Sequence, residues 1–204
     1  MSQNTSASER IASVADRSFY ERGTDRVSVR DILKEAAQGN MSAINYHFGG
    51  RDGLLQAVFR RRRERLNGDR NAYLDKAEAE GRGSEVRALV EASVYPHAKL
   101  VRESPPQSDF ARFAARMAPR VDYSSGAVDD LQSADQRVIR GLRHALKDLP
   151  ENVLDNRIDT AFNMILGVLA AYEVRREEGL THGPEDFDTL AETLIDMVTA
   201  GLTA

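Results

Sequence analysis

The chain has 204 residues, of which 41% are hydrophobic and 29% are charged, and it contains no cysteine. This balance is typical of a soluble globular protein with one or two domains, and the missing cysteines exclude disulfides, thiolate metal sites and cysteine nucleophiles. The longest apolar stretch, around residues 161–172, reaches roughly half of the ~20 residues that a membrane span needs. We therefore expect a soluble, cytoplasmic protein without a membrane segment or a signal peptide.

The net charge of −4 is distributed unevenly along the chain. Residues 1–66 contain 12 basic and 8 acidic side chains, whereas the remainder contains 16 basic and 24 acidic ones. A basic N-terminal third on an acidic body favours contact between that third and a polyanion such as nucleic acid.

Apolar residues recur at helical spacing along most of the chain, and strand or hairpin signals are nearly absent. Helices are predicted over about 7–22, 28–36, 40–47, 52–80, 84–102, a short stretch between Pro106 and Pro119, 128–148, 151–178 and 184–202. Gly23 is placed to end the first helix, and Ser28 with Asp31 has the form of a capping box for the second. Residues 120–127 are expected to form a loop. The sequence therefore predicts an all-α fold of about nine helices.

Residues 10–59 have the spacing of three short helices followed by a fourth, with only a tight break between the second and the third. This spacing is typical of a helix-turn-helix, in which the second helix of the pair enters the major groove of DNA. Other three-helix bundles share the spacing, so a protein-binding module is an alternative.

Three separated segments of this region carry a more specific pattern. Residues 15–23 are ADRSFYERG, residues 27–32 are VSVRDI, and residues 42–55 are SAINYHFGGRDGLL. This pattern resembles the DNA-binding module of the TetR family, the tetracycline-repressor-like bacterial regulators. The resemblance implies an N-terminal helix-turn-helix domain over residues 1–50 and a larger helical ligand-binding and dimerisation domain over residues 51–204. Many members have Ala-Gly-Val in the turn where this chain has Ala36-Ala37-Gln38-Gly39, which leaves the register of the third helix open.

The resemblance and the helix positions give candidate DNA contacts at the start of the second helix, along the third and after it. They are Ser28, Arg30, Asn40, Met41, Ser42, Asn45, Tyr46, His47 and Arg51. Asn45 carries the amide that a bidentate contact with adenine requires, whereas Tyr46 and Arg51 suit phosphate oxygens. In the alternative interpretation, Asn40 is only a helix cap and His47 only a structural histidine. The four consecutive arginines at 60–63 cannot all face one DNA backbone, so we expect a solvated face there.

The last two predicted helices are apolar on more than one face, which favours burial against a partner. The resemblance implies that they form a homodimer interface, with burial inside the chain itself as the alternative. The candidates are Ile165, Val168, Leu169, Tyr172, Leu190, Leu194, Met197 and Val198. Residues 84–148 are implied to form most of a ligand chamber, and its candidate lining is Tyr95, His97, Phe110, Phe113, Met117, Tyr123 and Phe162.

Catalytic and metal-binding patterns are missing from the sequence. The four histidines, His47, His97, His144 and His182, are far apart, and no His-Glu-x-x-His, phosphate loop or Gly-x-Ser-x-Gly elbow occurs. We therefore expect no catalytic residues, no metal and no cofactor. The resulting hypothesis is a transcriptional repressor that binds a palindromic operator in double-stranded DNA as a homodimer and is released by a small-molecule effector. A helical protein-interaction module without DNA binding, or an enzyme, is the alternative.

Overall fold

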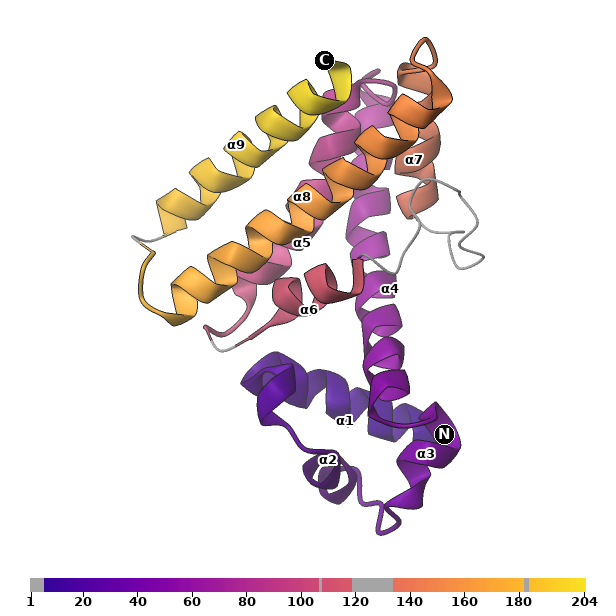
Figure 1. Cartoon of the computed structure of the whole chain (residues 1–204), viewed down its shortest axis with the longest axis vertical. Helices are drawn as coiled ribbons and strands as arrows, with labels where there is room; N and C mark the ends of the chain where they lie inside the picture. The colour runs from indigo at the N-terminus through magenta and orange to yellow at the C-terminus, as the bar shows by residue number, and fades with distance from the viewer. Residues whose placement is uncertain (1–5, 107, 119–133, 182–183) are drawn as a thin grey trace. The chain divides into compact units, whose positions relative to one another are not determined.

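The computed structural model describes residues 6–106, 108–118, 134–181 and 184–204, and these residues are helical without strands (Figure 1). The helices are α1 (Ala7–Arg22), the 3-10 turn η1 (Thr24–Arg26), α2 (Val29–Glu35), α3 (Ser42–Phe48), α4 (Arg51–Ala79), α5 (Val86–Glu103), α6 (Phe110–Met117), α7 (Ala134–Ala145), α8 (Glu151–Glu177) and α9 (Pro184–Thr203). The predicted all-α fold is confirmed. The predicted loop at 120–127 and the first residues of the helix predicted over 128–148 lie outside the described residues. None of the described helices is long and apolar enough to span a bilayer.

Side-chain caps fix the starts of α1 and α2. Ser6 accepts a hydrogen bond from the backbone of Glu9, whose carboxylate accepts in return from the backbone N–H of Ser6. Ser28 and Asp31 form the same reciprocal pair at the start of α2, as the sequence predicts. Gly23, at φ 83°, ends α1 and donates its N–H to the carbonyl of Phe19.

The turn between α2 and α3 places its left-handed residue at Ala37, which has a φ of 53°. The N–H of Gln38 donates to the carbonyl of Leu33 at 2.8 Å, and the N–H of Ala37 donates to that of Lys34 at 3.2 Å. These bonds satisfy the last carbonyls of α2 in a Schellman arrangement, in which the left-handed position normally holds glycine. The chain has therefore reversed before Gly39, and α3 begins at Ser42.

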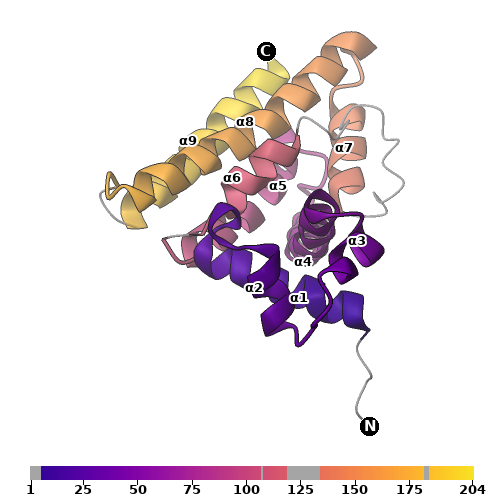
Figure 2. The same cartoon turned by 60° about the horizontal axis from the view of Figure 1, so that its bottom comes forward.

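The chain divides into two compact units, which we call the head and the body. The head contains Met1–Arg63 and Ser104–Phe110, and the body contains Glu64–Glu103 and Ala111–Ala204. The head extends past residue 50, the boundary predicted from the sequence, because Leu54 and Val58 of α4 are buried in its core. Figure 2 shows α1, α2 and α3 beside the start of α4. The other buried members of that core are Ile11, Ala15, Phe19, Val27, Ile32, Leu33, Ala36 and Ile44, contributed by α1 to α3 and the segments that join them.

The body is organised around α5, which packs against α7, α8 and α9, while α8 also packs against α9 (Figures 1 and 2). Ten residues of α5 are buried. The apolar face of α9 inserts Leu194, Ile195, Val198 and Leu202 into the body core, each at most 2% exposed.

Candidate nucleic-acid interface

Helix α3 has one buried side and one exposed side. Ile44 is 2% exposed and packs into the head core, and Ala43 and Phe48 pack against the same core. The sequence SAINYHF therefore places its polar members on the opposite side. Met41 is 57% exposed, and Tyr46, at 85%, is more exposed than any other large hydrophobic side chain described.

The ends of α3 are held by local hydrogen bonds. The side-chain oxygen of Asn40 accepts from the backbone N–H of Ser42 at 2.9 Å, and Met41 between them is the N-cap residue of α3. Gly49 ends the helix at φ 72°, and its N–H donates to the carbonyl of Asn45. His47 is exposed, and its ring lies edge-on to the ring of Tyr46 at a centroid distance of 4.9 Å. Asn45 and Ser42 are also exposed.

Arg51, a predicted phosphate contact, is turned toward the head itself. Its guanidinium donates to the carbonyls of Thr24 at 2.6 Å and Val27 at 2.9 Å, and it lies 5.9 Å from the ring centre of Phe19. These two bonds use two of the five N–H donors of the guanidinium. In this structure Arg51 therefore ties the start of α4 to the segment between α1 and α2.

The two candidates at the start of α2 differ in their surroundings. The hydroxyl of Ser28 donates to the carboxylate of Asp31 at 2.6 Å and accepts from its backbone N–H. The hydroxyl and the backbone N–H of Ser28 both donate to this carboxylate and lower the pKa of Asp31. Arg30 is exposed. Arg30 is thus available for a phosphate, whereas the hydroxyl of Ser28 already serves the cap.

One member of the arginine run at 60–63 is buried, contrary to the solvated face expected from the sequence. Arg62 is 3% exposed, and its guanidinium donates to the carboxylate of Asp16 at 2.8 Å and to the carbonyl of the same residue at 3.1 Å. It also lies over the ring of Phe110, 5.4 Å from its centre. Arg60 is exposed. Arg62 therefore joins α4 to α1 inside the head.

The segment Ser104–Phe110 belongs to the head through a contact that the sequence does not reveal. The carboxylate of Asp109, 5% exposed, accepts from the backbone N–H of Thr24 at 2.6 Å and from the hydroxyl of the same residue. Since the carbonyl of Thr24 accepts from Arg51, a chain of hydrogen bonds connects Asp109 to the start of α4.

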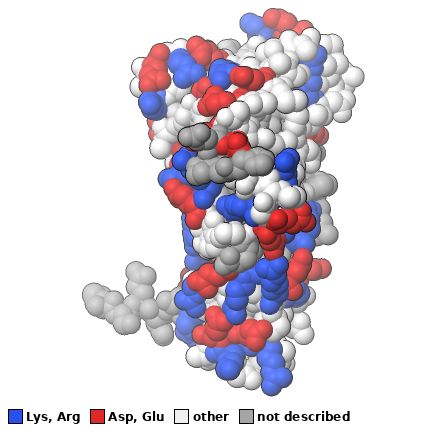
Figure 3. Space-filling model, turned by 90° about the vertical axis from the view of Figure 1, so that its left-hand side faces the viewer, with Lys and Arg blue, Asp and Glu red and all other residues white. Residues whose placement is uncertain are grey.

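Figure 3 shows the basic and acidic side chains interspersed over one face of the molecule. On that face, charge alone marks no continuous basic surface. The exposed side of α3 is the indication of a nucleic-acid interface that the preceding contacts give.

The predicted ligand-lining residues do not gather in one described cavity. Phe110, Phe113 and Phe162 are buried side chains, and Phe110 belongs to the head. His97 is half-buried against Arg70 and the carbonyl of Ser93. The side chain of Met117 and all of Tyr123 lie outside the described part of the chain.

A groove of about 1230 Å³ in the body is lined instead by residues of α4, α5 and α9. Of the predicted ligand-lining residues that the structure describes, Tyr95 is the one that contributes to it. No motif in the sequence predicts this groove, because the groove forms between helices that are distant in the sequence.

The predicted dimer residues fall into two groups. Ile165, Leu169, Leu194 and Val198 are buried inside the chain, between 0% and 3% exposed. Val168, Tyr172 and Leu190 are partly exposed, and Met197 is 59% exposed. The second group is therefore the one that can reach a partner in this conformation.

Comparisons with known proteins find a family match for part of the head. Residues 11–58 match the family described as bacterial regulatory proteins, tetR family. Among solved structures, the chain is similar to RolR in complex with resorcinol, with 15% identity, a TM-score of 0.57, and coverage of 96% of this chain and 92% of that chain. At that identity the likeness shows a shared fold. No curated protein sequence matches the chain significantly.

Among the described residues, no group of three or more His, Cys, Asp and Glu side chains is arranged to hold a metal ion.

Proposed function

We propose that this chain belongs to the TetR family of bacterial regulatory proteins and is a cytoplasmic transcriptional repressor that binds a palindromic operator as a homodimer. The observation that carries the proposal is the exposed polar side of α3, anchored from behind by Ile44. A helix held in this way can enter the major groove, which is about 12 Å wide. Because one short helix reads few base pairs, two heads on successive half-sites are the usual solution.

Each exposed side chain of α3 suits a particular DNA group. The amide of Asn45 suits the paired donor and acceptor of adenine in the major groove. The hydroxyl of Tyr46 suits a phosphate oxygen, as does the guanidinium of Arg30 on α2. We leave Arg51 out of the proposed contacts because its guanidinium already serves two carbonyls of the head.

Selection of bound fragments from random double-stranded DNA, followed by fluorescence anisotropy with the enriched site, tests DNA binding. We expect a two-fold symmetric site and a binding constant that falls steeply with salt, because phosphate contacts release counterions. Asn45→Ala and Tyr46→Ala should each weaken binding at least tenfold, whereas Glu21→Ala, an exposed change on α1, should not. No enriched site, or a protein captured through α3 in place of DNA, would overturn the proposal.

A row of small or uncharged side chains on α8 and α9 suits the homodimer interface. Gly167, Ala171 and Val174 are exposed on α8, and Met197 and Gly201 are exposed on α9. A Cβ atom added at Gly167 or Gly201 would meet nothing within 4 Å, so both positions face open space. Small residues let two helix pairs approach closely, and the row lacks charges that would need desolvation.

Sedimentation of charge-introducing variants tests this interface. We expect the natural chain to be a dimer at micromolar concentration and Gly167→Arg to be a folded monomer. Gly68→Arg is the matched control, because Gly68 is also an exposed helical glycine facing open space, on α4. A monomeric natural chain, or dissociation by both variants alike, would contradict the proposed interface.

Release by a small-molecule effector needs a connection between body and head, and residues 109–112 supply one. Asp109 is hydrogen-bonded to Thr24 in the head, whereas the backbone N–H groups of Ala111 and Arg112 donate to Glu173 in the body. A ligand that moves the start of α6 therefore pulls on both sets of bonds. Its effect on DNA affinity should shrink in Asp109→Asn, because the amide binds the backbone N–H of Thr24 less strongly. An undiminished effect would exclude this route.

A further inference from the structure

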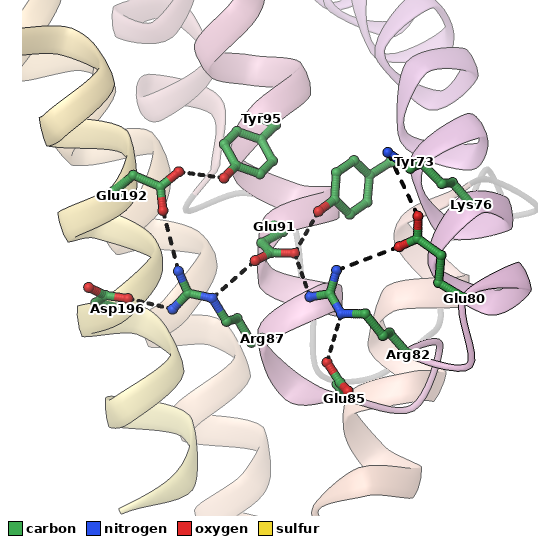
Figure 4. A network of polar contacts seen from close by, with 10 residues as sticks. All are labelled: Tyr73, Lys76, Glu80, Arg82, Glu85, Arg87, Glu91, Tyr95, Glu192 and Asp196. Carbon is green, nitrogen blue, oxygen red and sulfur yellow. Dashed lines mark hydrogen bonds and ion pairs between the residues drawn. The ribbon is translucent and has the colours of Figure 1, made fainter. Parts of the chain in front are cut away.

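The groove in the body has α5 along its base and α4 and α9 on either side (Figure 4). Tyr73 of α4 and Tyr95 of α5 both line it, with their ring centres 5.7 Å apart at a tilt of 42°. Its volume of about 1230 Å³ exceeds the usual ~300–1,000 Å³ of small-molecule sites, so a small ligand would fill part of it.

Both tyrosines are fixed at their hydroxyl ends by carboxylates. Tyr73 donates to Glu91 at 2.5 Å, and Tyr95 donates to Glu192 of α9. Burial and the bond to Glu91 raise the pKa of Tyr73 to about 12, and burial with the bond to Glu192 raises the pKa of Tyr95 as well. Both phenols therefore stay neutral at physiological pH, with their protons directed at carboxylates and their ring surfaces held in place.

Three carboxylates surround Arg87, the cation beside these tyrosines. The Nε atom of Arg87 donates to Glu91 at 3.0 Å, while its two terminal nitrogens donate to Glu192 and Asp196. Figure 4 shows Glu192 between Tyr95 and Arg87, with one oxygen toward each. Each carboxylate oxygen has two lone pairs, so these acids can accept further hydrogen bonds, while Arg87 uses three of its five N–H donors on them.

The three basic residues of the lining itself also stand beside acids. Lys99 pairs with Asp69 at 3.5 Å, Arg102 pairs with Asp188 at 2.7 Å, and Lys76 lies 3.8 Å from Glu80. The lining has five acids, Asp69, Glu103, Asp188, Glu192 and Asp196, against three bases, Lys76, Lys99 and Arg102, and Arg87 beside the lining pairs with two of these acids. The groove therefore offers a negative balance and spare hydrogen-bond acceptors around two aromatic rings.

From this chemistry we propose that the groove binds an aromatic primary ammonium compound. The ammonium group donates to Glu192 and Asp196, whose side chains are 53% and 66% exposed and so remain accessible. The aromatic part of the ligand lies against Tyr95 and Tyr73, where cation–π attraction and ring contact add to the charge interaction. An anion of the same shape meets like charge, and a neutral alcohol gains only the ring contacts.

Calorimetric titration with three probes of similar shape tests the charge requirement. The probes are 2-phenylethylammonium, 2-phenylethanol and 3-phenylpropionate, each titrated into the full-length protein. We expect the ammonium to bind at least tenfold more tightly than the alcohol and the carboxylate not to bind measurably. Equal binding of the three probes, or no saturable binding of the ammonium at millimolar concentration, would overturn the proposal.

Two variants test the location of the site. Glu192→Gln removes the central charge and should weaken ammonium binding at least fivefold. Tyr95→Leu removes one of the two rings and should weaken the binding of both the ammonium and the alcohol. Glu151→Gln, an exposed acid of α8 outside the groove, is the matched control and should bind as the natural chain does. Circular dichroism checks that each variant is folded. Unchanged affinity in folded Glu192→Gln would place the ligand elsewhere and contradict the proposal. Since binding is measured without DNA, its outcome is independent of whether α3 recognises an operator.

Discussion

Arg70 of α4 supplies the hydrogen bond that Pro96 removes from the interior of α5. Pro96 has no N–H, so the carbonyl of Ala92, four residues earlier, loses its helical partner. The Nε atom of Arg70 donates to that carbonyl at 3.2 Å, and its terminal nitrogens bind Asp135 of α7 and the ring of His97. Arg70 is 2% exposed, and one guanidinium thus joins three helices of the body.

This relationship predicts that the two residues are energetically coupled. Arg70→Leu should lower the free energy of unfolding by about 3–5 kcal/mol, because it leaves Asp135 buried without its cation. In a Pro96→Ala background the loss should be smaller by about 1 kcal/mol, since an alanine at this position provides the N–H for the carbonyl of Ala92. Urea unfolding of the four proteins in a double-mutant cycle measures the difference. A coupling of zero would show that the carbonyl does not depend on Arg70.

Gly53 is required where α4 follows α3. A Cβ atom at this position would lie 1.6 Å from the carbonyl oxygen of Phe48, which is backbone and cannot rotate away. Gly53→Ala should therefore destabilise the head by about 3 kcal/mol or more. Gly68→Ala in the same helix should instead raise the free energy of unfolding by about 1 kcal/mol, because Gly68 faces open space and alanine favours helix. Thermal unfolding by circular dichroism compares the two, and equal effects would contradict the contact.

Ala37 is expected to be a site of backbone strain. An L-residue in the left-handed region costs roughly 1–2 kcal/mol, and glycine avoids this cost. Ala37→Gly should therefore raise the free energy of unfolding by about 1 kcal/mol. Ala36→Gly is the control: its φ of −78° suits alanine, so the same change one residue earlier should destabilise. Chemical denaturation distinguishes these opposite signs.

The helix bounds can be predicted from sequence because their causes act within one turn. Ser28 and Asp31 cap α2 through atoms three residues apart, and Gly23 ends α1 through its own backbone. The exposed side of α3 is predictable for the same reason, since the polar residues around Ile44 fall on the other side of a helix. In the turn, the displaced glycine leaves the register open, and the structure shows that an alanine takes the left-handed position.

The partners of buried charges cannot be predicted in this way. Arg62 is buried beside Asp16, yet in sequence it is one of four identical residues. Asp109 and Thr24 lie 85 residues apart, and no local pattern marks either as half of a pair. The groove that Tyr95 lines likewise depends on which faces of α4, α5 and α9 meet. Such features follow from packing between helices, which periodicity within one helix does not specify.

Glu91 should make the stability of the body sensitive to acid. Burial alone would raise its pKa, but hydrogen bonds from Tyr73 and Arg82, with the charge of Arg87, lower the pKa below 4.5. A carboxylate whose pKa is lower in the folded state stabilises the fold above its unfolded pKa, and this contribution is lost as the pH falls through the folded value. Melting temperatures measured from neutral pH to below 4.5 should therefore fall less steeply in Glu91→Gln. Glu85→Gln, on the exposed side of Arg82, should retain the natural slope.

Two glutamates of α8, one turn apart, should differ sharply in their contribution to stability. Glu173 is fully buried and accepts the backbone N–H groups of Ala111 and Arg112, each at 2.9 Å. Glu177 pairs with the side chain of Arg112 at 2.8 Å near the surface. In Glu173→Gln the amide nitrogen faces a backbone N–H group and cannot accept its hydrogen bond. We therefore expect the free energy of unfolding to fall by about 2–3 kcal/mol.

Glu177→Gln should cost less than about 1 kcal/mol, because a solvent-accessible ion pair contributes little. Urea unfolding of the two variants under identical conditions measures this difference. If both variants lost the same free energy of unfolding, the charge of Arg112 would be the interaction that holds α6 to α8. A large loss confined to Glu173→Gln would instead identify the backbone at the start of α6 as the attachment point.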